Sequence, residues 1–361
     1  MPLYMDFHKI DNVTVDGVKS AHTADESIQA KYGVKYHQFW VNQKEGTVFC
    51  LVEGPDAKTC ELVHQLAHGN LACAMTEVEP GSFKFFMGDK LTVDHGLTRS
   101  EDGDVDDGYR FVMVVMMRGM MSAKNTDQAQ LQPPLWAKGK ITEHISAHRG
   151  RTKKWPLADT LIGVFDDADA AITCAKEIQG ELTRDNTSHV IFKIGITADQ
   201  PVTRDGEFFS KAIHLAHRLC TAVHDNQILV SALASRLCTI GNTSSEFKFL
   251  DATDEEFVCR LLDVTDHKLA LETFNISTIC KDIGISRPQL YRKITAITGR
   301  APNDFLRNLR LEKSLTLVQQ REKNISQIAL EVGYTNPSYF SKCFAEKFGC
   351  TPSEVLVSAN K

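Results

Sequence analysis

The chain has 361 residues, enough for two or three domains, and with 42% hydrophobic and 24% charged residues its composition is ordinary for a soluble protein. It has no signal peptide, no apolar run near the roughly 18 residues of a membrane span, and ten cysteines without regular spacing, so we expect a cytoplasmic protein with reduced thiols. Residues 268–361 carry 14 Lys and Arg against 8 Asp and Glu, whereas the rest of the chain has a balance of −11, a distribution typical of a tail that meets phosphate.

Residues 1–80 are predicted to form a domain in the order βαββαβ, which favours a ferredoxin-like sheet with helices on one face. The hydrophobic patterns indicate strands at 3–10, 34–41, 46–54 and 71–79, and helices at 15–33 and 56–69.

Histidines are concentrated in this domain: His8, His22, His37, His64 and His68, with Cys50 on the third predicted strand. His64 and His68 stand four residues apart, so they share a helix face and can grip one metal ion. Imidazole with thiolate suits nickel, zinc or copper rather than magnesium. Histidines at this spacing also serve as surface or packing residues, and Cys50 fits a buried core thiol equally well.

Residues 21–69 resemble a small bacterial family of nickel-binding proteins of ferredoxin-like fold. The shared pattern is a His and an Asp on the first helix, a Trp on the second strand, FCL on the third strand and VHxxAHG on the second helix. The matching positions are His22, Asp25, Trp40, Cys50, His64 and His68. The resemblance implies a site for nickel, or for zinc, with His22, Cys50, His64 and His68 as candidate ligands.

Residues 81–106 are predicted to be a linker. The acidic, glycine-bearing stretch Arg99 to Gly108 lacks the twelfth-position glutamate of an EF-hand calcium loop, so we expect it to be solvated.

Residues 107–266 alternate strands and helices and are predicted to form an α/β domain. Strands are expected at 109–119, 155–165, 188–197 and 227–231, with short strands near 246–251 and 256–264, and helices at 133–151, 167–183, 206–223 and 232–238. The basic segment His148 to Lys154 is predicted to be a solvated turn.

This middle segment, and residues 192–231 above all, resembles the class III nucleotide cyclase domain. Those cyclases place two aspartates on neighbouring strands to hold two metal ions. Asp159 matches one of them, but the other position falls near Met116, where the sequence has no carboxylate. The family's transition-state arginine matches Arg218.

Two further positions depart from the cyclase pattern: His214 replaces a usual asparagine and Ser210 a usual glycine. Without the second acid, two-metal catalysis should be lost. We therefore expect a catalytically silent domain that binds a nucleotide or pairs with its twin.

The C-terminal segment contains one motif twice, at residues 275–302 and 324–352. In each copy a short apolar helix ends at a glycine and a second helix begins at a polar cap. The glycines are Gly284 and Gly333, and the caps are Ser286 and Asn336. Between the copies, one long helix is predicted, so two helix-turn-helix units share a spine and can address two successive major-groove faces of one duplex.

Residues 267–361 resemble the double helix-turn-helix DNA-binding domain of the AraC/XylS transcription regulators, and the second copy fits the family signature nearly position by position. The resemblance implies base contacts from Gln289 and Arg292 in the first unit and from Ser338 and Lys342 in the second, with Arg287, Lys293 and Asn336 placed for base or backbone contacts. Arg and Lys suit guanine, and Gln suits adenine. Pro288 departs from the family, which often has a contacting side chain at that position.

The sequence therefore predicts a multidomain, non-enzymatic transcription regulator that binds an operator in double-stranded DNA. Its upstream domains would sense a metal or a small ligand and form a homodimer, with no role for a membrane. The alternatives are a nucleotide cyclase or nucleotide-binding sensor fused to a DNA-binding domain, a metal-buffering protein, and a generic helical bundle in place of the DNA-binding domain.

Overall fold

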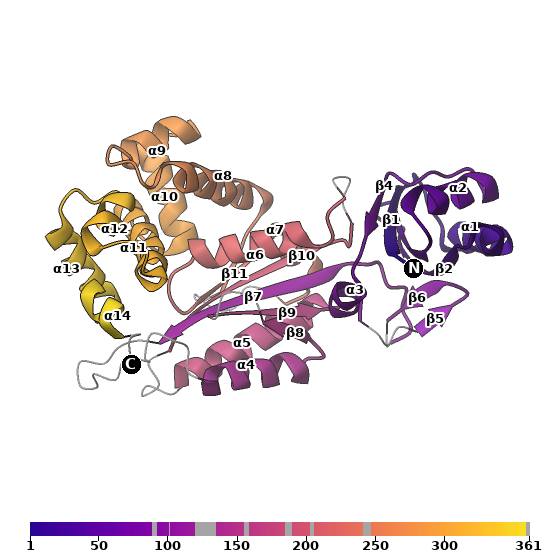
Figure 1. Cartoon of the computed structure of the whole chain (residues 1–361), viewed down its shortest axis with the longest axis horizontal. Helices are drawn as coiled ribbons and strands as arrows, with labels where there is room; N and C mark the ends of the chain where they lie inside the picture. The colour runs from indigo at the N-terminus through magenta and orange to yellow at the C-terminus, as the bar shows by residue number, and fades with distance from the viewer. Residues whose placement is uncertain are drawn as a thin grey trace.

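The computed structural model describes residues 1–88, 92–100, 102–119, 135–154, 159–184, 190–202, 206–240 and 247–358. Two six-stranded sheets lie one after the other along the molecule, and a helical C-terminal part occupies the end opposite the N-terminal sheet (Figure 1). No helix within these described ranges is long and apolar enough to span a bilayer.

The N-terminal sheet has the strand order β4-β1-β3-β2-β6-β5, and its first four strands pair antiparallel. The strands are β1 (Leu3–Lys9), β2 (Lys35–Asn42), β3 (Thr47–Glu53), β4 (Ala74–Glu77), β5 (Thr92–Asp94) and β6 (Leu97–Arg99). The helices are α1 (Val15–Ile28), the short 3-10 helix η1 (Gln29–Tyr32), α2 (Ala57–Ala67) and α3 (Pro80–Met87). The predicted βαββαβ order of residues 1–80 is thus confirmed.

Alternation along the strands divides the N-terminal core between the two faces of this sheet. Phe39 and Cys50 face α1 and form one apolar cluster with Val18. Trp40 and Phe49 point the other way, into a cluster that includes Phe86 of α3, Val112 and other residues of the middle domain. One face of the N-terminal sheet is therefore buried against the next domain of the same chain.

The segment predicted as a linker, 81–106, has structure of its own in its described residues. It continues α3 and adds β5 and β6 to the sheet edge. Residues 102–104 of the acidic stretch are exposed, as predicted, but its end is not solvated, because Asp106 pairs with the buried Arg110 at 2.7 Å and accepts a hydrogen bond from Trp40 Nε1 at 3.1 Å. A buried guanidinium needs a carboxylate partner, and this stretch supplies it.

The middle sheet has the order β12-β11-β10-β7-β9-β8, with β7 paired antiparallel to both β9 and β10. Its strands are β7 (Arg110–Gly119), β8 (Arg151–Lys154), β9 (Thr160–Phe165), β10 (Val190–Asp199), β11 (Gln227–Val230) and β12 (Phe247–Phe249). The helices α4 (Leu135–Ala147) and α5 (Ala168–Arg184) lie on one face, α6 (Ser210–Ala222) on the other, and α7 (Ala232–Leu237) follows β11 (Figure 1). Parts of the predicted elements at 133–134, 155–158 and 188–189 lie outside the described residues.

Two predictions for the middle domain were wrong in part or in whole. The basic segment 148–154 is a turn only at 148–150, because Arg151–Lys154 form the edge strand β8 and Arg151 pairs with Asp166 at 2.6 Å. Residues 256–264 are not a strand but part of α8 (Ala252–Lys268), which Asp251 caps by accepting a hydrogen bond from the N–H of Asp254. This helix runs across the domain boundary predicted between residues 266 and 267.

The C-terminal part is helical throughout its described residues after β12 (Figure 1). Its further helices are α9 (Ile276–Ile283), α10 (Arg287–Thr298), α11 (Pro302–Gln320), α12 (Ile325–Glu331), α13 (Pro337–Phe348) and α14 (Pro352–Ser358). Gly284 adopts a left-handed conformation after α9, and Ser286 and Asn336 cap α10 and α13. This helix stop and these two N-caps are therefore confirmed.

Two separate apolar cores meet along the spine helix α11. Its first half contributes Phe305 and Leu309 to a core shared with α8, α9 and α10. Its second half contributes Leu315 and Val318 to a core shared with α12, α13 and α14. The two helix-turn-helix units are thus held by opposite halves of one helix.

The second unit also contacts the middle domain through buried charges. Glu312 of α11 accepts from Lys193 of β10 at 3.3 Å and from Lys347 of α13 at 2.7 Å. At the end of β7, Arg118 pairs with Asp225 at 3.4 Å and lies 5.0 Å from the ring centroid of Phe348. These contacts fix α13 against the middle sheet.

Asp199 at the end of β10 generates a prediction about pH. Burial raises the pKa of Asp199 to about 6, against the opposing effects of the Gln200 N–H and Lys211. Because this value exceeds the unfolded one of about 3.9, the folded chain binds more protons between the two values, and its stability should fall as pH rises through that window. Asp199→Asn should remove this fall, which the two pKa values limit to about 3 kcal/mol at neutral pH.

Thermal unfolding at pH 4.5 and pH 7 measures this difference. The exposed Asp11→Asn provides the matched control and should leave the pH dependence unchanged. If Asp199→Asn kept the pH profile of the unaltered chain, the Asp199 carboxyl would not be the cause of the fall in stability with rising pH.

Candidate metal centre and nucleic-acid interface

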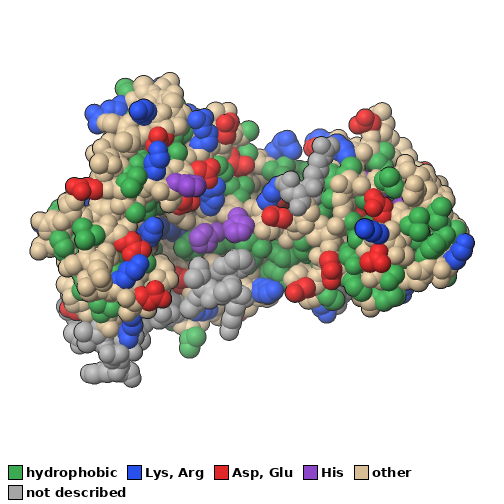
Figure 2. Space-filling model, turned by 45° about the horizontal axis from the view of Figure 1, so that its top comes forward, with side chains coloured by type: hydrophobic (Ala, Val, Ile, Leu, Met, Phe, Trp, Pro, Cys, Tyr) green, Lys and Arg blue, Asp and Glu red, His purple; other side chains and the backbone are tan. Residues whose placement is uncertain are grey.

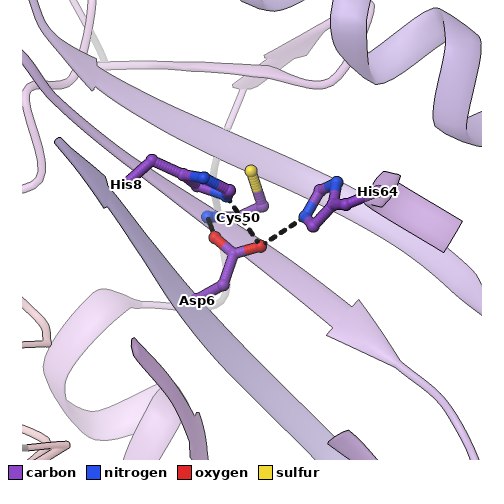
Figure 3. A group of neighbouring side chains, drawn as sticks. All are labelled: Asp6, His8, Cys50 and His64. Carbon is purple, nitrogen blue, oxygen red and sulfur yellow. Dashed lines mark hydrogen bonds and ion pairs between the residues drawn. The ribbon is translucent and has the colours of Figure 1, made fainter. Parts of the chain in front are cut away.

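Four side chains from three elements meet between the N-terminal sheet and α2. Asp6 and His8 stand two residues apart on β1, so they share the face that points to the helices. Cys50 comes from the neighbouring β3, and His64 from α2 (Figure 3). All four are buried, and one ligand atom of each lies within 4.8 Å of the others. We call this set the first group.

Asp6 is the centre of the first group. One of its oxygens, Oδ2, lies 2.7 Å from His64 Nε2 and 3.3 Å from His8 Nε2 (Figure 3). Its other oxygen accepts a hydrogen bond from the Cys50 N–H at 2.7 Å. Burial favours the neutral acid, but His8 and His64 outweigh it and hold the pKa of Asp6 well below its usual range.

Three side chains form a second group around the other nitrogen of the same imidazole. His64 Nδ1 lies 3.0 Å from Asp25 Oδ2 and 3.1 Å from His68 Nε2, and the last two atoms are 3.2 Å apart. Asp25 comes from α1, and His68 follows the last turn of α2. Burial alone would lower the pKa of His64. The hydrogen bonds and charges of Asp25 and Asp6 outweigh this effect and raise the pKa to about 10.

Of the four ligands predicted from the sequence, Cys50, His64 and His68 fall in these groups, whereas His22 does not. His22 lines a cavity of about 260 Å³ that His64 and His68 also line. The His22 ring lies 3.6 Å from the carboxylate of Glu26. Its buried ring packs against Phe39, with no hydrogen bond from either nitrogen to a described residue. Burial lowers the pKa of His22, against the opposing effects of Glu26 and Asp25.

The sequence-based ligand set omitted Asp6, His8 and Asp25. Asp6 and His8 had one detectable signal, since polar residues at positions i and i+2 of a strand face the same side. Their partner Cys50 lies on β3, and that pairing is not a local property of the sequence. The combined donors, imidazole, thiol and carboxylate, fit nickel or zinc and do not fit the all-oxygen sites of calcium and magnesium.

The candidate DNA contacts of the first helix-turn-helix unit lie on α10. Arg287, Gln289 and Arg292 are exposed, but the Gln289 side chain accepts a hydrogen bond from the Ser286 N–H at 2.9 Å as part of a capping box. Lys293 is only partly exposed, because it pairs with Asp254 of α8 at 3.4 Å. Arg287 and Arg292 are therefore the more available pair.

In the second unit, Ser338 and Lys342 of α13 are exposed, and Lys342 makes only a long 4.0 Å pair with Glu346. Asn336 caps the helix and accepts from the N–H groups of Ser338 and Tyr339, so its side chain already has a structural role. Lys and Arg side chains are spread over this end of the molecule, with acidic side chains between them (Figure 2).

Two exposed tyrosines were missed by the sequence analysis. Tyr291 on α10 and Tyr339 on α13 are 56% and 53% exposed, respectively, and each lies on the helix that carries the candidate contacts. An apolar ring on such a helix can contact a thymine methyl group in the major groove.

In the middle domain, the carboxyl-bearing Asp159 lies beside the position that lacks an acid. The Met117 N–H donates to the Asp159 carbonyl at 2.9 Å, so Asp159 and Met116 are neighbours across the sheet. Arg218 binds α8 instead of facing this place, donating to the Cys259 carbonyl at 2.6 Å and to Asp263 at 2.8 Å. Its guanidinium connects α6 to the C-terminal helices.

Comparison with known families matches two regions of the chain. Residues 279–357 match a helix-turn-helix domain family, and residues 4–78 match the family described as nickel responsive protein SCO4226-like.

Among curated relatives, histidine kinase P4 of Formosa agariphila is 36% identical over 105 residues, which are 29% of this chain and 8% of that protein. The transcriptional activator RhaS of Mannheimia succiniciproducens is 35% identical over 68 residues, 19% of this chain and 25% of that protein. The chain thus spans a quarter or less of the length of these two relatives. The crystal structure of SCO4226 from Streptomyces coelicolor A3(2) is 35% identical, with 21% of this chain and 94% of that chain covered and a TM-score of 0.20.

The buried carboxylate Asp6 yields a prediction for the metal-free chain. His64→Gln should lower the local free energy of unfolding of β1 and α2 by about 3 kcal/mol, because a buried charge that loses its partner is strongly destabilising. Hydrogen–deuterium exchange of these two elements measures the loss. The control His37→Gln removes a half-exposed pair with Glu53 and should cost less than about 1 kcal/mol. Equal effects of the two substitutions would contradict the assignment.

Proposed function

We propose that this chain, which carries an AraC-type helix-turn-helix domain at its C-terminus and an SCO4226-like domain at its N-terminus, is a sequence-specific transcription regulator that responds to nickel or zinc. The observation that carries the metal response is the pair of buried ligand groups around His64. The observation that carries DNA binding is the presence of two helix-turn-helix units on one spine, α11.

The DNA contact follows from the arrangement of the two units. Each presents a capped helix, α10 or α13, whose exposed side chains can enter a major groove. Arg292 and Lys342 would read base edges, and the remaining basic side chains would supply salt-dependent attraction to phosphate. The partner is thus double-stranded DNA, bound at an operator by a homodimer of this chain.

The metal response requires a physical connection between the two ends of the chain. The N-terminal sheet buries Trp40 and Phe49 against the middle domain, and the middle sheet holds α13 through Lys193, Glu312 and Lys347. An ion that binds one arrangement of the N-terminal domain more tightly shifts the DNA-competent population by that difference in affinity. A tenfold difference corresponds to about 1.4 kcal/mol.

We further assign the N-terminal domain to the ferredoxin-like fold and the middle domain to a cyclase-like fold without catalytic activity. The β4-β1-β3-β2 order of antiparallel strands supports the first assignment. Met116 beside Asp159 and the engagement of Arg218 with α8 support the loss of catalysis. In this proposal the middle domain transmits the response and contributes to the dimer.

Arg292→Ala and Lys342→Ala test the DNA contact. Each should weaken specific binding by about 1–3 kcal/mol and relax the sequence preference at its own base, because a bidentate or close base contact is lost. The measurement is a gel shift of the full chain on a duplex selected from a random library by the unaltered protein. The control Lys58→Ala removes one exposed charge from α2 and should change affinity little. Unchanged affinity and preference in both recognition-helix variants would reject the assignment.

Metal titration tests the response. Calorimetry of the metal-stripped full chain with nickel and with zinc should show tight binding that His64→Gln abolishes or weakens at least about 100-fold, as expected when a ligand is lost. The affinity for the selected duplex should then change by fivefold or more when the metal is added, and should stay constant in His64→Gln. Tight metal binding without any effect on DNA affinity would instead support a metal-buffering role.

A further inference from the structure

We propose that the cluster in the N-terminal domain holds two metal ions, with the imidazole of His64 between them as a shared ligand. The inference rests on the metal response proposed above, but it adds a second ion and names the ligands of each. The first ion would be held by Asp6, His8, Cys50 and His64 Nε2, and the second by Asp25, His68 and His64 Nδ1.

The two nitrogens of His64 face different ligand groups. Nε2 lies 2.7 Å from Asp6 Oδ2, whereas Nδ1 lies 3.0 Å from Asp25 Oδ2 and 3.1 Å from His68 Nε2. Because the nitrogens of an imidazole point in divergent directions, a single ion cannot bind both. His64 is the only member common to the two groups found among the described residues.

The second group has the dimensions of a metal triad. Its three atoms form a triangle with sides of 3.0, 3.1 and 3.2 Å. Bonds of about 2.0–2.1 Å to nitrogen and oxygen place neighbouring ligand atoms about 2.8–3.0 Å apart in octahedral geometry and about 3.3–3.4 Å apart in tetrahedral geometry. Two imidazoles and one carboxylate on one face of an ion also leave positions open for further ligands.

Hydrogen bonding alone does not satisfy this triangle. Each hydrogen bond joins a donor to an acceptor. When each of three atoms is either a donor or an acceptor, at least two of them have the same role and cannot bond to each other. With Asp25 as a carboxylate, which only accepts, one side of the triangle joins two donors or two acceptors at close range in every arrangement of the imidazole protons. In addition, Asp25 Oδ1 is buried without a hydrogen-bond partner among the described residues, on a side chain that is only 2% exposed. A cation in the triangle turns all three contacts into favourable ones.

The two ions should bind in a fixed order. In the first group, His8 Nδ1 lies 3.3 Å from the Leu71 carbonyl, to which it can donate while Nε2 faces the ion. In the second group, His68 Nδ1 accepts a hydrogen bond from the Asn70 N–H at 3.1 Å, so the ring proton of this tautomer is on Nε2. Before Nε2 can coordinate an ion, the proton must move to Nδ1 and the hydrogen bond to Asn70 must break. The second ion therefore binds more weakly. When it binds, His64 becomes an imidazolate and its ring proton passes to solvent.

Copper(II) tests the arrangement in the metal-stripped full chain, because two copper ions joined by an imidazolate are magnetically coupled. We expect two ions per chain by calorimetry and elemental analysis, and a paramagnetic resonance signal much weaker than two isolated ions would give. The signal of two isolated copper(II) ions should return when acid releases them, which distinguishes magnetic coupling from reduction to copper(I) at the thiols. Asp25→Asn and His68→Gln should reduce the stoichiometry to one ion and restore the full signal of a single copper. The control His37→Gln, outside both groups, should bind two coupled ions.

Nickel distinguishes the first ion from the second. The thiolate of Cys50 should give a nickel charge-transfer band that survives in Asp25→Asn and disappears in Cys50→Ser. Circular dichroism checks that each variant is folded. If the chain binds only one nickel ion and shows the charge-transfer band of Cys50, the second site is overturned and the proposed metal response stands. Two ions without magnetic coupling would overturn the bridge, and no binding at all would remove both proposals.

Discussion

A buried arginine at each end of one strand connects the three parts of the chain. At the start of β7, Arg110 pairs with Asp106 at 2.7 Å and with Asp166 at 2.9 Å, which joins the N-terminal segment to the middle sheet. Near the end of the same strand, Arg118 lies over Phe348, the last residue of α13, and pairs with Asp225. β7 extends along the middle domain between these two junctions (Figure 1). The position of the two helix-turn-helix units relative to the candidate metal centre depends on this strand.

Charged junctions of this kind favour discrete arrangements over gradual ones. Glu312 is partly exposed, but its partners Lys193 and Lys347 are largely buried, so an intermediate position in which they have lost Glu312 leaves two cations without a partner and is poorly populated. The apolar contacts of Trp40 and Phe86 act in the same direction at the other junction, since a packed core does not deform continuously. In the proposed function, a change at the candidate metal centre would reach α13 as a shift between two packed states.

Local signals predicted much of the fold and part of the site. The caps Ser286 and Asn336 and the stop at Gly284 depend on neighbouring residues alone, and they were located correctly. Residues 256–264 were taken for a strand because a short apolar run fits either periodicity, and the cap at Asp251 that decides for a helix lies upstream. The grouping of Asp6 and His8 with Cys50, and of Asp25 with His64, depends on strand pairing and helix packing, which no local pattern specifies.

The spine helix α11 sets the angle between the two helix-turn-helix units. Its 19 residues correspond to a length of about 28 Å, and the two cores attach to its opposite halves. One inserted or deleted residue between Leu309 and Leu315 would turn the second unit by about 100° around the helix axis. The length of this helix is therefore under a stricter constraint than its sequence: substitutions on its exposed side leave the geometry intact, whereas an insertion of even one residue would aim the two units at different sides of the duplex.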